Sequence, residues 1–341
     1  MAEPGGSSRT ELPVALDAMG GDRAPGEIVA GGLEAVAAGL PVVLVGPDDG
    51  SLGDTGGLEV IAAREVIEMK DDPARAVRTK KDSSLVRAAE AVRDRRASAM
   101  VSAGNTGATM AAALLRMGRL QGVSRPCIAT PLPVPGGSHS VMVDAGANSD
   151  CQPEWLVQFA QMGAAFFTER YGTARPRVAL LSIGEESSKG NQLTKETHVR
   201  LAEGNWGEAF EFIGNVEGRG LLTGEADVVV TDGFTGNVAL KSLEGSLKTF
   251  MTILGGVMAA TEETKAASEV LLPGLLEAAA PLDPENTGGA MLLGVDGVCI
   301  ISHGSSSRRA IVNAVRVGHD LAARGLVDKI AEAVRSAADG L

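Results

Sequence analysis

Apolar and polar positions follow one another in a repeating order along the chain. A short apolar run is followed by a polar loop, and many of the loops lead into segments whose apolar residues recur with helical spacing. The short runs predict buried strands and the periodic segments predict helices. The expected strands cover residues 13–17, 42–45, 58–62, 99–101, 125–131, 140–144, 178–182, 228–230 and 298–301. One expected helix starts near residue 25 and another lies within 71–96, and further helices are expected over 107–117, 153–170, 238–258, 262–280, 306–324 and 327–338. This alternation predicts an α/β chain with a mainly parallel sheet covered by helices on both faces.

Polar, glycine-containing loops follow three of the expected strands. They are residues 102–107 (SAGNTG), 232–237 (DGFTGN) and 302–307 (SHGSSS). Glycine lets the backbone approach an anion closely, and the N-terminus of a following helix offers unpaired N–H groups. One such loop alone is as readily a tight turn, so the repetition is what favours an anion site. Because the carboxyl ends of parallel strands share one edge of a sheet, we expect the three loops to converge on one crevice.

Further polar loops follow the strands that end near Asp17, Asp144 and Ser182. The last of these contains Lys189, within GEESSKGN. Beside a phosphate crevice a lysine acts as a point-charge ligand. An exposed surface lysine is the commoner role, since lysine is mostly exposed in folded proteins.

Composition excludes several classes of function. An apolar content of 44% with 22% charged residues indicates a globular chain, and the net charge of −12 with 3% aromatics disfavours nucleic-acid binding. Cys127, Cys151 and Cys299 are far apart and the four histidines are scattered, so neither a metal site nor a disulfide framework is indicated. Cys151 follows Asp150, which disfavours a thiolate, and we interpret it as structural. There is no Gly-x-Ser-x-Gly, Walker A or clean GxGxxG motif, and no cofactor is expected. The remaining chemistry is the positioning of a phosphate or a developing oxyanion.

A locally basic segment stands out on this acidic chain, between residues 71 and 96. A solvated helix face is the usual explanation of such a segment, and a docking surface for an acidic partner is the alternative. The candidate docking residues are Arg78, Lys80, Lys81, Arg87 and Arg93.

A second unusual segment is apolar and contains a Pro-Gly pair at residues 273–274. We predict a helical hairpin over about 240–282 with its tip here, at Leu271, Leu272, Leu275 and Leu276. A core or dimer contact is favoured over a bilayer contact, because basic residues are few around it. Residues 1–11 are expected to form a disordered tail, and 12–341 a single domain. With no signal peptide and no run of about 20 apolar residues, a cytoplasmic protein is expected, at most peripheral to a membrane.

Eight stretches, in order, resemble the phosphate acyltransferases of bacterial phospholipid synthesis, known as the PlsX family. They are VALDAMGGD, SAGNTGA, VDAGANSDC, IGEESSKGN, FIGNVEGR, ADVVVTDGFTGNVALK, GGAMLLG and SHGSSS, and the resemblance extends over about residues 14–316. It implies that inorganic phosphate attacks the thioester of a long-chain acyl group on acyl carrier protein. The acyl phosphate formed would feed a glycerol-3-phosphate acyltransferase.

The same resemblance implies a homodimeric three-layer α/β/α sandwich, related to the isocitrate-dehydrogenase-like and phosphotransacetylase folds. A projecting helical hairpin would contact the inner face of the membrane peripherally. The acidic carrier protein would dock on the basic segment. Phosphate is the nucleophile, so no covalent acyl-enzyme is required.

Residue roles follow from the matched motifs. Lys189 would neutralise phosphate and Asn237 would donate to the thioester oxygen. The predicted phosphate-binding residues are Gly104, Asn105, Thr106, Asn148, Thr235, Gly236, His303 and Ser305. Asp17, Asp144 and Asp232 are expected to orient loops. Two alternatives stay open: a phosphotransacetylase that uses acyl-coenzyme A, and a non-catalytic phosphate- or nucleotide-binding regulator.

Overall fold

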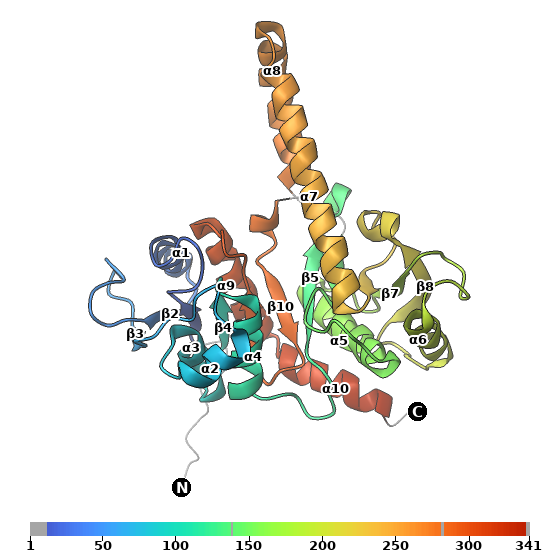
Figure 1. The fold of residues 1–341 in the computed structure, drawn as a ribbon, viewed down its shortest axis with the longest axis horizontal. Helices are drawn as coiled ribbons and strands as arrows, with labels where there is room; N and C mark the ends of the chain where they lie inside the picture. The colour runs from blue at the N-terminus through green and yellow to red at the C-terminus, as the bar shows by residue number, and fades with distance from the viewer. Residues whose placement is uncertain (1–11, 138, 281–282, 339–341) are drawn as a thin grey trace.

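The computed structural model describes residues 12–137, 139–280 and 283–338, and within them eleven strands form one sheet (Figure 1). The strands are β1 Val14–Asp17, β2 Val42–Gly46, β3 Val60–Ala62, β4 Ala99–Ser102, β5 Cys127–Leu132, β6 Ser140–Val143, β7 Arg177–Ser182, β8 Glu211–Glu217, β9 Val228–Val230, β10 Ala290–Leu293 and β11 Val298–Ile301. Their order across the sheet is β3-β2-β1-β4-β11-β10-β5-β6-β9-β7-β8. The tail predicted for residues 1–11 lies outside the described residues.

The helices of the described chain cover both faces of the sheet. They are α1 Gly26–Ala37, α2 Pro73–Thr79, α3 Ser84–Arg93, α4 Thr106–Arg116, α5 Pro153–Tyr171, α6 Gln192–Glu203, α7 Gly233–Met258, α8 Glu262–Ala279, α9 Arg308–Ala323 and α10 Leu326–Ala338. Short 3₁₀ turns are η2 Pro135–Gly137, η3 Gly218–Leu222 and η5 Pro284–Asn286. The predicted α/β/α sandwich with a mainly parallel sheet is confirmed, whereas α6, β8 and β10 were not predicted.

The direction of the strands inverts across the middle of the sheet. β10 is antiparallel to both β11 and β5, and β5 is antiparallel to β6. The other pairs are parallel. Three reversals separate β11 from β6, so β1, β4 and β11 run opposite to β6, β9 and β7. The carboxyl ends of these two groups therefore lie at opposite edges of the sheet.

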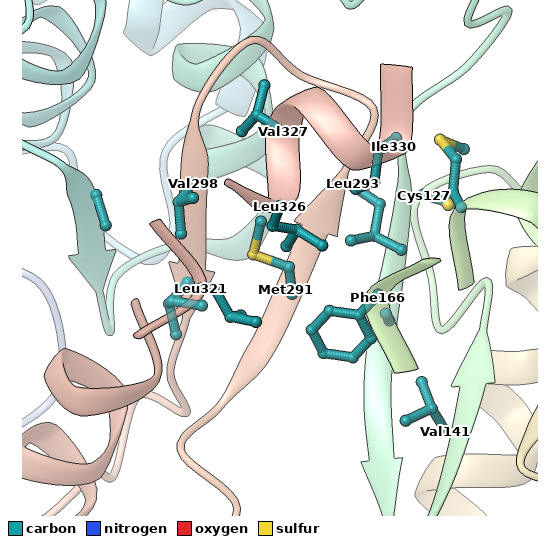
Figure 2. Packing of buried hydrophobic residues seen from close by; sticks show 14 of the residues in the cluster. Cys127, Val141, Phe166, Met291, Leu293, Val298, Leu321, Leu326, Val327 and Ile330 are labelled. Atoms are coloured by element: carbon teal, nitrogen blue, oxygen red, sulfur yellow. The ribbon is translucent and has the colours of Figure 1, made fainter. Parts of the chain in front are cut away.

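Alternating side chains of each strand enter two separate apolar cores. Val14 and Leu16 of β1 belong to the core under α1, α5, α9 and α10, while Ala15 belongs to the core under α2, α3 and α4. Figure 2 shows part of the first core, with Met291 and Leu293 of β10 near Leu326 of α10. Burial on both faces explains why these strands are continuous apolar runs.

The pair α7–α8 forms a hairpin that projects from the body (Figure 1). The turn between the helices spans 259–261, where the Thr261 hydroxyl accepts from the Thr264 N–H at 3.2 Å in a capping box. The prediction of a tip at 273–274 is wrong, because Pro273 lies inside α8. The four leucines are exposed along the side of α8 instead: Leu271, Leu272, Leu275 and Leu276. No helix among the described residues is long and apolar enough to span a membrane.

Candidate active site

Three loops lie side by side after β6, β9 and β7, and we call residues 144–150, 182–191 and 231–237 the lysine edge. β9 pairs with β6 on one side and with β7 on the other. The pairing with β6 continues past the strand ends, because Thr231 N donates to Val143 O at 2.7 Å and Asp144 N donates to Thr231 O at 3.0 Å. Lys189 and Asn237 stand on neighbouring loops of this edge.

The carboxylate of Asp144 organises the first of these loops. Its Oδ1 accepts from the backbone N–H groups of Ile128, Gly146 and Ala147 at 2.9, 3.2 and 3.0 Å. Its Oδ2 accepts from Asn148 N at 2.8 Å and from Asn148 Nδ2 at 2.9 Å. Asp144 is fully buried, and burial raises its pKa although the hydrogen bonds act in the opposite direction. The carboxylate thus holds the 144–148 turn and exposes no oxygen to a ligand.

The first turn of α7 is pressed against that turn. Gly233 N donates to Asn148 O at 2.8 Å, and a Cβ on Gly236 would overlap the carbonyl oxygen of Asp144. A glycine is required at position 236 for this approach. Asn237 is exposed, and its amide lies beside Gly146, where an added Cβ would stand 3.5 Å from Asn237 Oδ1.

Asp232 caps α7 and accepts hydrogen bonds from two of the residues predicted to bind phosphate, Thr235 and Gly236. Its Oδ1 accepts from Thr235 N at 2.9 Å and its Oδ2 accepts from the Thr235 hydroxyl at 2.7 Å. Gly236 N donates to Asp232 O at 2.9 Å. The donors of Thr235 and Gly236 are therefore hydrogen-bonded within the turn and are not available to phosphate. The side-chain amide of Asn237 is exposed at the same turn.

The loop that carries Lys189 is fixed to the neighbouring strand β8. Asn215 Nδ2 donates to Glu186 O at 3.0 Å, and Lys189 N donates to the same oxygen at 3.0 Å. The Lys189 side chain folds over Gly184, where an added Cβ would lie 2.7 Å from Lys189 Cγ. Lys189 is exposed and has no ion pair within the described chain. Asn215 was not predicted as a site residue, although it stands in the FIGNVEGR motif.

The remaining loops share the opposite edge of the sheet, and we call residues 17–22, 102–107 and 302–307 the histidine edge. Asp17 is buried there, and its Oδ2 accepts from the Ser102 hydroxyl at 2.7 Å. Ser102 Oγ accepts in turn from Gly104 N at 3.1 Å. Burial raises the pKa of Asp17, opposed by hydrogen bonds from Ser84 and Ser102.

The polar side chains of the histidine edge are engaged with neighbouring loops. Asn105 caps α4 by accepting from Ala108 N at 3.0 Å, and its Nδ2 donates to Met69 O at 2.9 Å. His303 Nδ1 lies 2.8 Å from Ser305 Oγ. Thr106 is exposed at the first position of α4.

The predicted single crevice is therefore wrong for one chain. Lys189, Asn237, Asn148, Thr235 and Gly236 lie at the lysine edge. The other predicted phosphate ligands lie at the histidine edge: Gly104, Asn105, Thr106, His303 and Ser305. Strands rise about 3.3 Å per residue, so a four-residue strand such as β6 separates the edges by about 13 Å. A phosphate ion cannot bridge that distance.

The described residues of the lysine edge provide neither a reactive cysteine thiolate nor a cluster of metal ligands. The Cys151 thiol donates to Asn148 O at 3.5 Å, and burial raises its pKa to about 12. It is therefore a thiol rather than a nucleophilic thiolate near neutral pH. The described residues contain no cluster of three or more His, Cys, Asp or Glu side chains placed to hold a metal.

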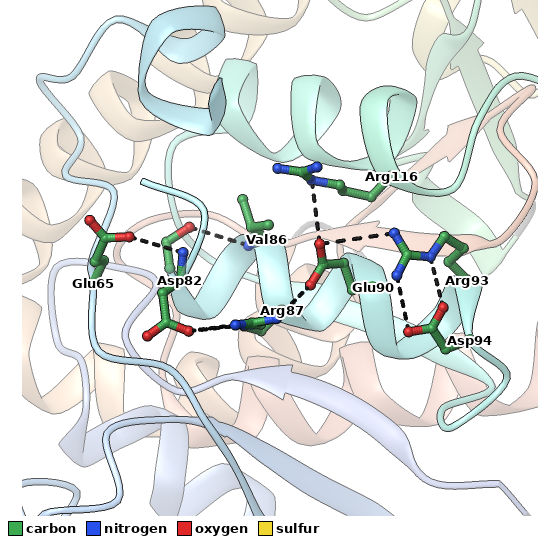
Figure 3. A network of polar contacts seen from close by, with 9 residues as sticks. Glu65, Asp82, Val86, Arg87, Glu90, Arg93, Asp94 and Arg116 are labelled. Atoms are coloured by element: carbon green, nitrogen blue, oxygen red, sulfur yellow. Dashed lines mark hydrogen bonds and ion pairs between the residues drawn. The ribbon is translucent and has the colours of Figure 1, made fainter. Parts of the chain in front are cut away.

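The basic segment is largely neutralised by its own neighbours (Figure 3). Arg87 pairs with Asp82 at 2.9 Å and with Glu90 at 3.0 Å, and Arg93 pairs with Asp94 at 2.7 Å. Lys80 pairs with Asp71 at 2.6 Å. Of the predicted docking residues, Arg78 and Lys81 are exposed and carry no ion pair with another described residue. The surface that remains positive is smaller than predicted.

Solved structures define the class of fold. The EutD phosphotransacetylase from Staphylococcus aureus superposes with a TM-score of 0.59 at 16% identity, over 92% of this chain and 95% of that chain. A branched-chain phosphotransacylase from Enterococcus faecalis V583 gives 0.57 at 14% identity, over 91% and 99%. At such identities the likeness shows the fold alone, and the chain has the phosphotransacetylase-type α/β/α fold.

Sequence comparison then shows the family. The family model described as "Fatty acid synthesis protein" matches residues 12–329. A protein named phosphate acyltransferase from Anaeromyxobacter dehalogenans (strain 2CP-C) is 47% identical over 333 residues, covering 94% of this chain and 90% of its own. Another of that name, from Geobacillus sp. (strain WCH70), is 44% identical over 329 residues, covering 95% and 98%. The chain belongs to this family of fatty acid synthesis proteins, and the resemblance to the phosphate acyltransferases is confirmed.

Proposed function

We propose that this protein is a phosphate acyltransferase that moves a long-chain acyl group from acyl carrier protein to inorganic phosphate. A phosphate oxygen attacks the thioester carbonyl carbon and forms a tetrahedral oxyanion. The carbon–sulfur bond then breaks, acyl phosphate forms, and the carrier thiolate leaves and takes up a proton. The observation that carries this proposal is an unpaired lysine beside an exposed amide on neighbouring loops, in a chain 47% identical to a relative named for this activity.

The lysine edge supports a division of roles between two side chains. The Lys189 ammonium has no ion pair in the described chain, so its charge is available to hold phosphate next to the thioester. The Asn237 amide donates to the carbonyl oxygen as negative charge develops on it. The positive end of the α7 dipole lies beneath this oxygen and adds to its stabilisation. Asp144 does not repel phosphate strongly, because five N–H donors already surround its carboxylate.

A homodimer belongs to the same proposal, with residues 12–341 of each copy forming one catalytic domain. If the histidine edge also contacts phosphate, it must be the histidine edge of a second copy, because one ion cannot reach both edges of one sheet. Exposed apolar side chains on the hairpin favour burial against a second copy or a membrane surface: Phe250, Met251, Ile253, Val257, Val270 and Leu276. Contact with the inner face of the membrane would place acyl phosphate near the glycerol-3-phosphate acyltransferase that uses it.

Arg78 and Lys81 are the docking residues that we retain for the acidic carrier protein.

The test is phosphate-dependent release of the free carrier thiol from palmitoyl-acyl carrier protein. We expect release that requires phosphate, exceeds the release from palmitoyl-coenzyme A, and collapses in a Lys189→Ala variant. Lys329→Ala is the matched control, since Lys329 is an exposed lysine on α10. Preference for the coenzyme A donor would instead identify a phosphotransacetylase. Folded protein that binds phosphate and releases no thiol from either donor would identify a regulator.

A further inference from the structure

Large apolar side chains are exposed at the lysine edge and at the next residue of α7, although a phosphate ion binds through polar groups. Ile183 is 81% exposed, Phe234 is 65% exposed and Val238 is 49% exposed. None of the three belongs to either apolar core or packs against one. Their exposure therefore does not result from folding requirements, and exposed apolar groups at a site point to an apolar ligand.

These side chains surround the two residues to which we assign the chemistry. Phe234 stands three residues before Asn237 and four before Val238 in the first turns of α7, so its side chain is a neighbour of both on the helix surface. Asn237 and Val238 lie on either side of it, about 100° apart around the helix axis. Ile183 directly precedes Gly184, over which the Lys189 side chain folds. β7 and β9 are paired with Leu180 opposite Val230, so Ile183 and Phe234 leave adjacent strands three and four residues beyond that pair. The apolar side chains thus come from both of the loops that carry Lys189 and Asn237.

We propose that Ile183, Phe234 and Val238 form an acyl rim, which binds the methylene groups of the donor's fatty acyl chain next to the thioester. This inference rests on the proposed function. With the carbonyl oxygen at Asn237, the acyl chain leaves the carbonyl carbon across the neighbouring Phe234 side chain, towards Val238. Phosphate approaches from the Lys189 side. Methylenes that leave water on contact with the rim contribute favourable transfer free energy, and an acetyl group has none to offer.

The acyl rim therefore makes the transfer selective for chain length. It distinguishes a fatty acyl donor from an acetyl donor by contacts close to the reacting carbon. A second copy of the chain is the competing occupant of these side chains. The fatty acyl chain is favoured because Phe234 and Val238 stand on either side of Asn237 in the sequence of the first turns of α7, so a protein covering both would also cover the amide.

The experiment measures kcat/KM for phosphate-dependent thiol release from acetyl-, butyryl-, octanoyl- and palmitoyl-acyl carrier protein. Ile183→Asn and Phe234→Ser are compared with wild type and with Leu115→Asn. Leu115 is 49% exposed on α4, on the other half of the sheet. We expect each rim variant to lower the palmitoyl-to-acetyl ratio of kcat/KM about tenfold, the effect of one to two methylene contacts, and to leave the acetyl value within about twofold.

Three results would overturn the acyl rim while leaving the proposed function in place. The first is an unchanged chain-length ratio in the rim variants, and the second is an equal loss for all donors. The third is conversion of a dimer to a monomer on size-exclusion chromatography with the ratio unchanged, which would assign the side chains to a second copy. If wild-type protein releases no thiol from any donor, the proposed function itself fails and the acyl rim fails with it.

Discussion

The two edges of the sheet use a buried carboxylate in different ways. At the lysine edge the Asp144 carboxylate accepts five N–H donors, all but one of them from the backbone. At the histidine edge the Asp17 carboxylate accepts from the hydroxyls of Ser102 and Ser84 and from Met19 N, the last at 3.3 Å. Both carboxylates hold loops in shape, and only at the lysine edge does the shaped loop stand beside an unpaired ammonium group.

The side chains that each edge presents to solvent also differ. The loops of the histidine edge contain no lysine or arginine, and the Asn105 amide is used by a helix cap and by Met69 O. The lysine edge presents Lys189 without an ion pair in the described chain, and Asn237 with an exposed amide. Similar loop sequences at the ends of strands therefore do not have equal chemical capacity. What distinguishes them is which donors remain after the loop has satisfied its own backbone.

The largest effect should come from exchanging an asparagine at each edge. Asn237→Ala removes a donor to the oxyanion and should lower kcat for thiol release by about 10² to 10³. Asn105→Ala removes a helix cap and should cost about 1 kcal/mol of unfolding free energy with less than a tenfold change in kcat. Steady-state kinetics and urea unfolding on both variants separate these outcomes. A larger kcat loss in Asn105→Ala would move the chemistry to the histidine edge.

The next effect concerns the two carboxylates. Asp144→Ala leaves buried N–H groups without acceptors, each costing about 1–3 kcal/mol, and should lower the unfolding free energy by about 3 kcal/mol or more. Asp17→Ala strands fewer donors and should cost about half as much. Urea denaturation followed by circular dichroism measures both. Equal losses would show that water replaces the Asp144 carboxylate, and the contrast between the edges would disappear.

The inversion of the sheet shows where sequence reasoning reaches its limit. Apolar runs such as Val228–Val230 predict strands, because burial on both faces requires them. The direction of a strand is indicated in the sequence only by the length of its connection, and the short connection between β5, which ends at Leu132, and β6, which begins at Ser140, is that of an antiparallel pair. The two reversals at β10 cancel, so β11 and β5 run in the same direction, and the antiparallel β5–β6 pair alone inverts one half of the sheet relative to the other. The single-crevice prediction failed because it took all the strands as parallel. The separate positions of Lys189 and His303 follow from the β5–β6 pairing.

The pairing of charges within the basic segment could have been predicted from the sequence. Glu90 stands three residues from both Arg87 and Arg93, and such spacing on a helix brings opposite charges together. This spacing predicts that Arg87 and Arg93 are paired, and it reduces the predicted docking surface to the residues without an ion pair.

The acyl rim could not be predicted from the sequence, because an isoleucine that follows an apolar strand is indistinguishable from a core residue until its exposure is known. The sequence also indicated Asp144 as a loop-orienting residue, without any sign that both of its oxygens are saturated.

A third and smaller effect compares one glycine from each edge. A Cβ on Gly236 would overlap the carbonyl oxygen of Asp144, so Gly236→Ala must displace α7 from the 144–148 turn. We expect a loss of about 2 kcal/mol in unfolding free energy, within the range of overpacked sites, together with a lower kcat because Asn237 moves. A Cβ on Gly104 would lie 3.2 Å from Ser102 Oγ, and the hydroxyl can yield. Gly104→Ala should therefore cost about 1 kcal/mol or less. Thermal unfolding of the pair is the measurement, and equal melting temperatures would contradict the close approach at the lysine edge.

The smallest effect is on the pH dependence of stability. Burial raises the pKa of Asp17 above its ordinary value of 3.8, so between 3.8 and the folded pKa the folded state holds a proton that the unfolded state has released. The contribution of Asp17 to the unfolding free energy therefore falls as the pH rises through that window, and it stays low above it.

The Asp17→Asn variant tests this, because its amide oxygen still accepts from Ser102 while the titrating carboxyl group is removed. Relative to wild type, this variant should gain stability as the pH rises from 3.8 through the raised pKa of the folded state, as measured by urea titrations over a pH series. A stability difference that does not change with pH would show that Asp17 titrates normally in the fold. Asp144→Asn differs in its overall stability, because one amide oxygen cannot serve five donors, and it should be less stable than wild type throughout this range. Burial raises the pKa of Asp144 too, so this deficit should narrow as the pH rises.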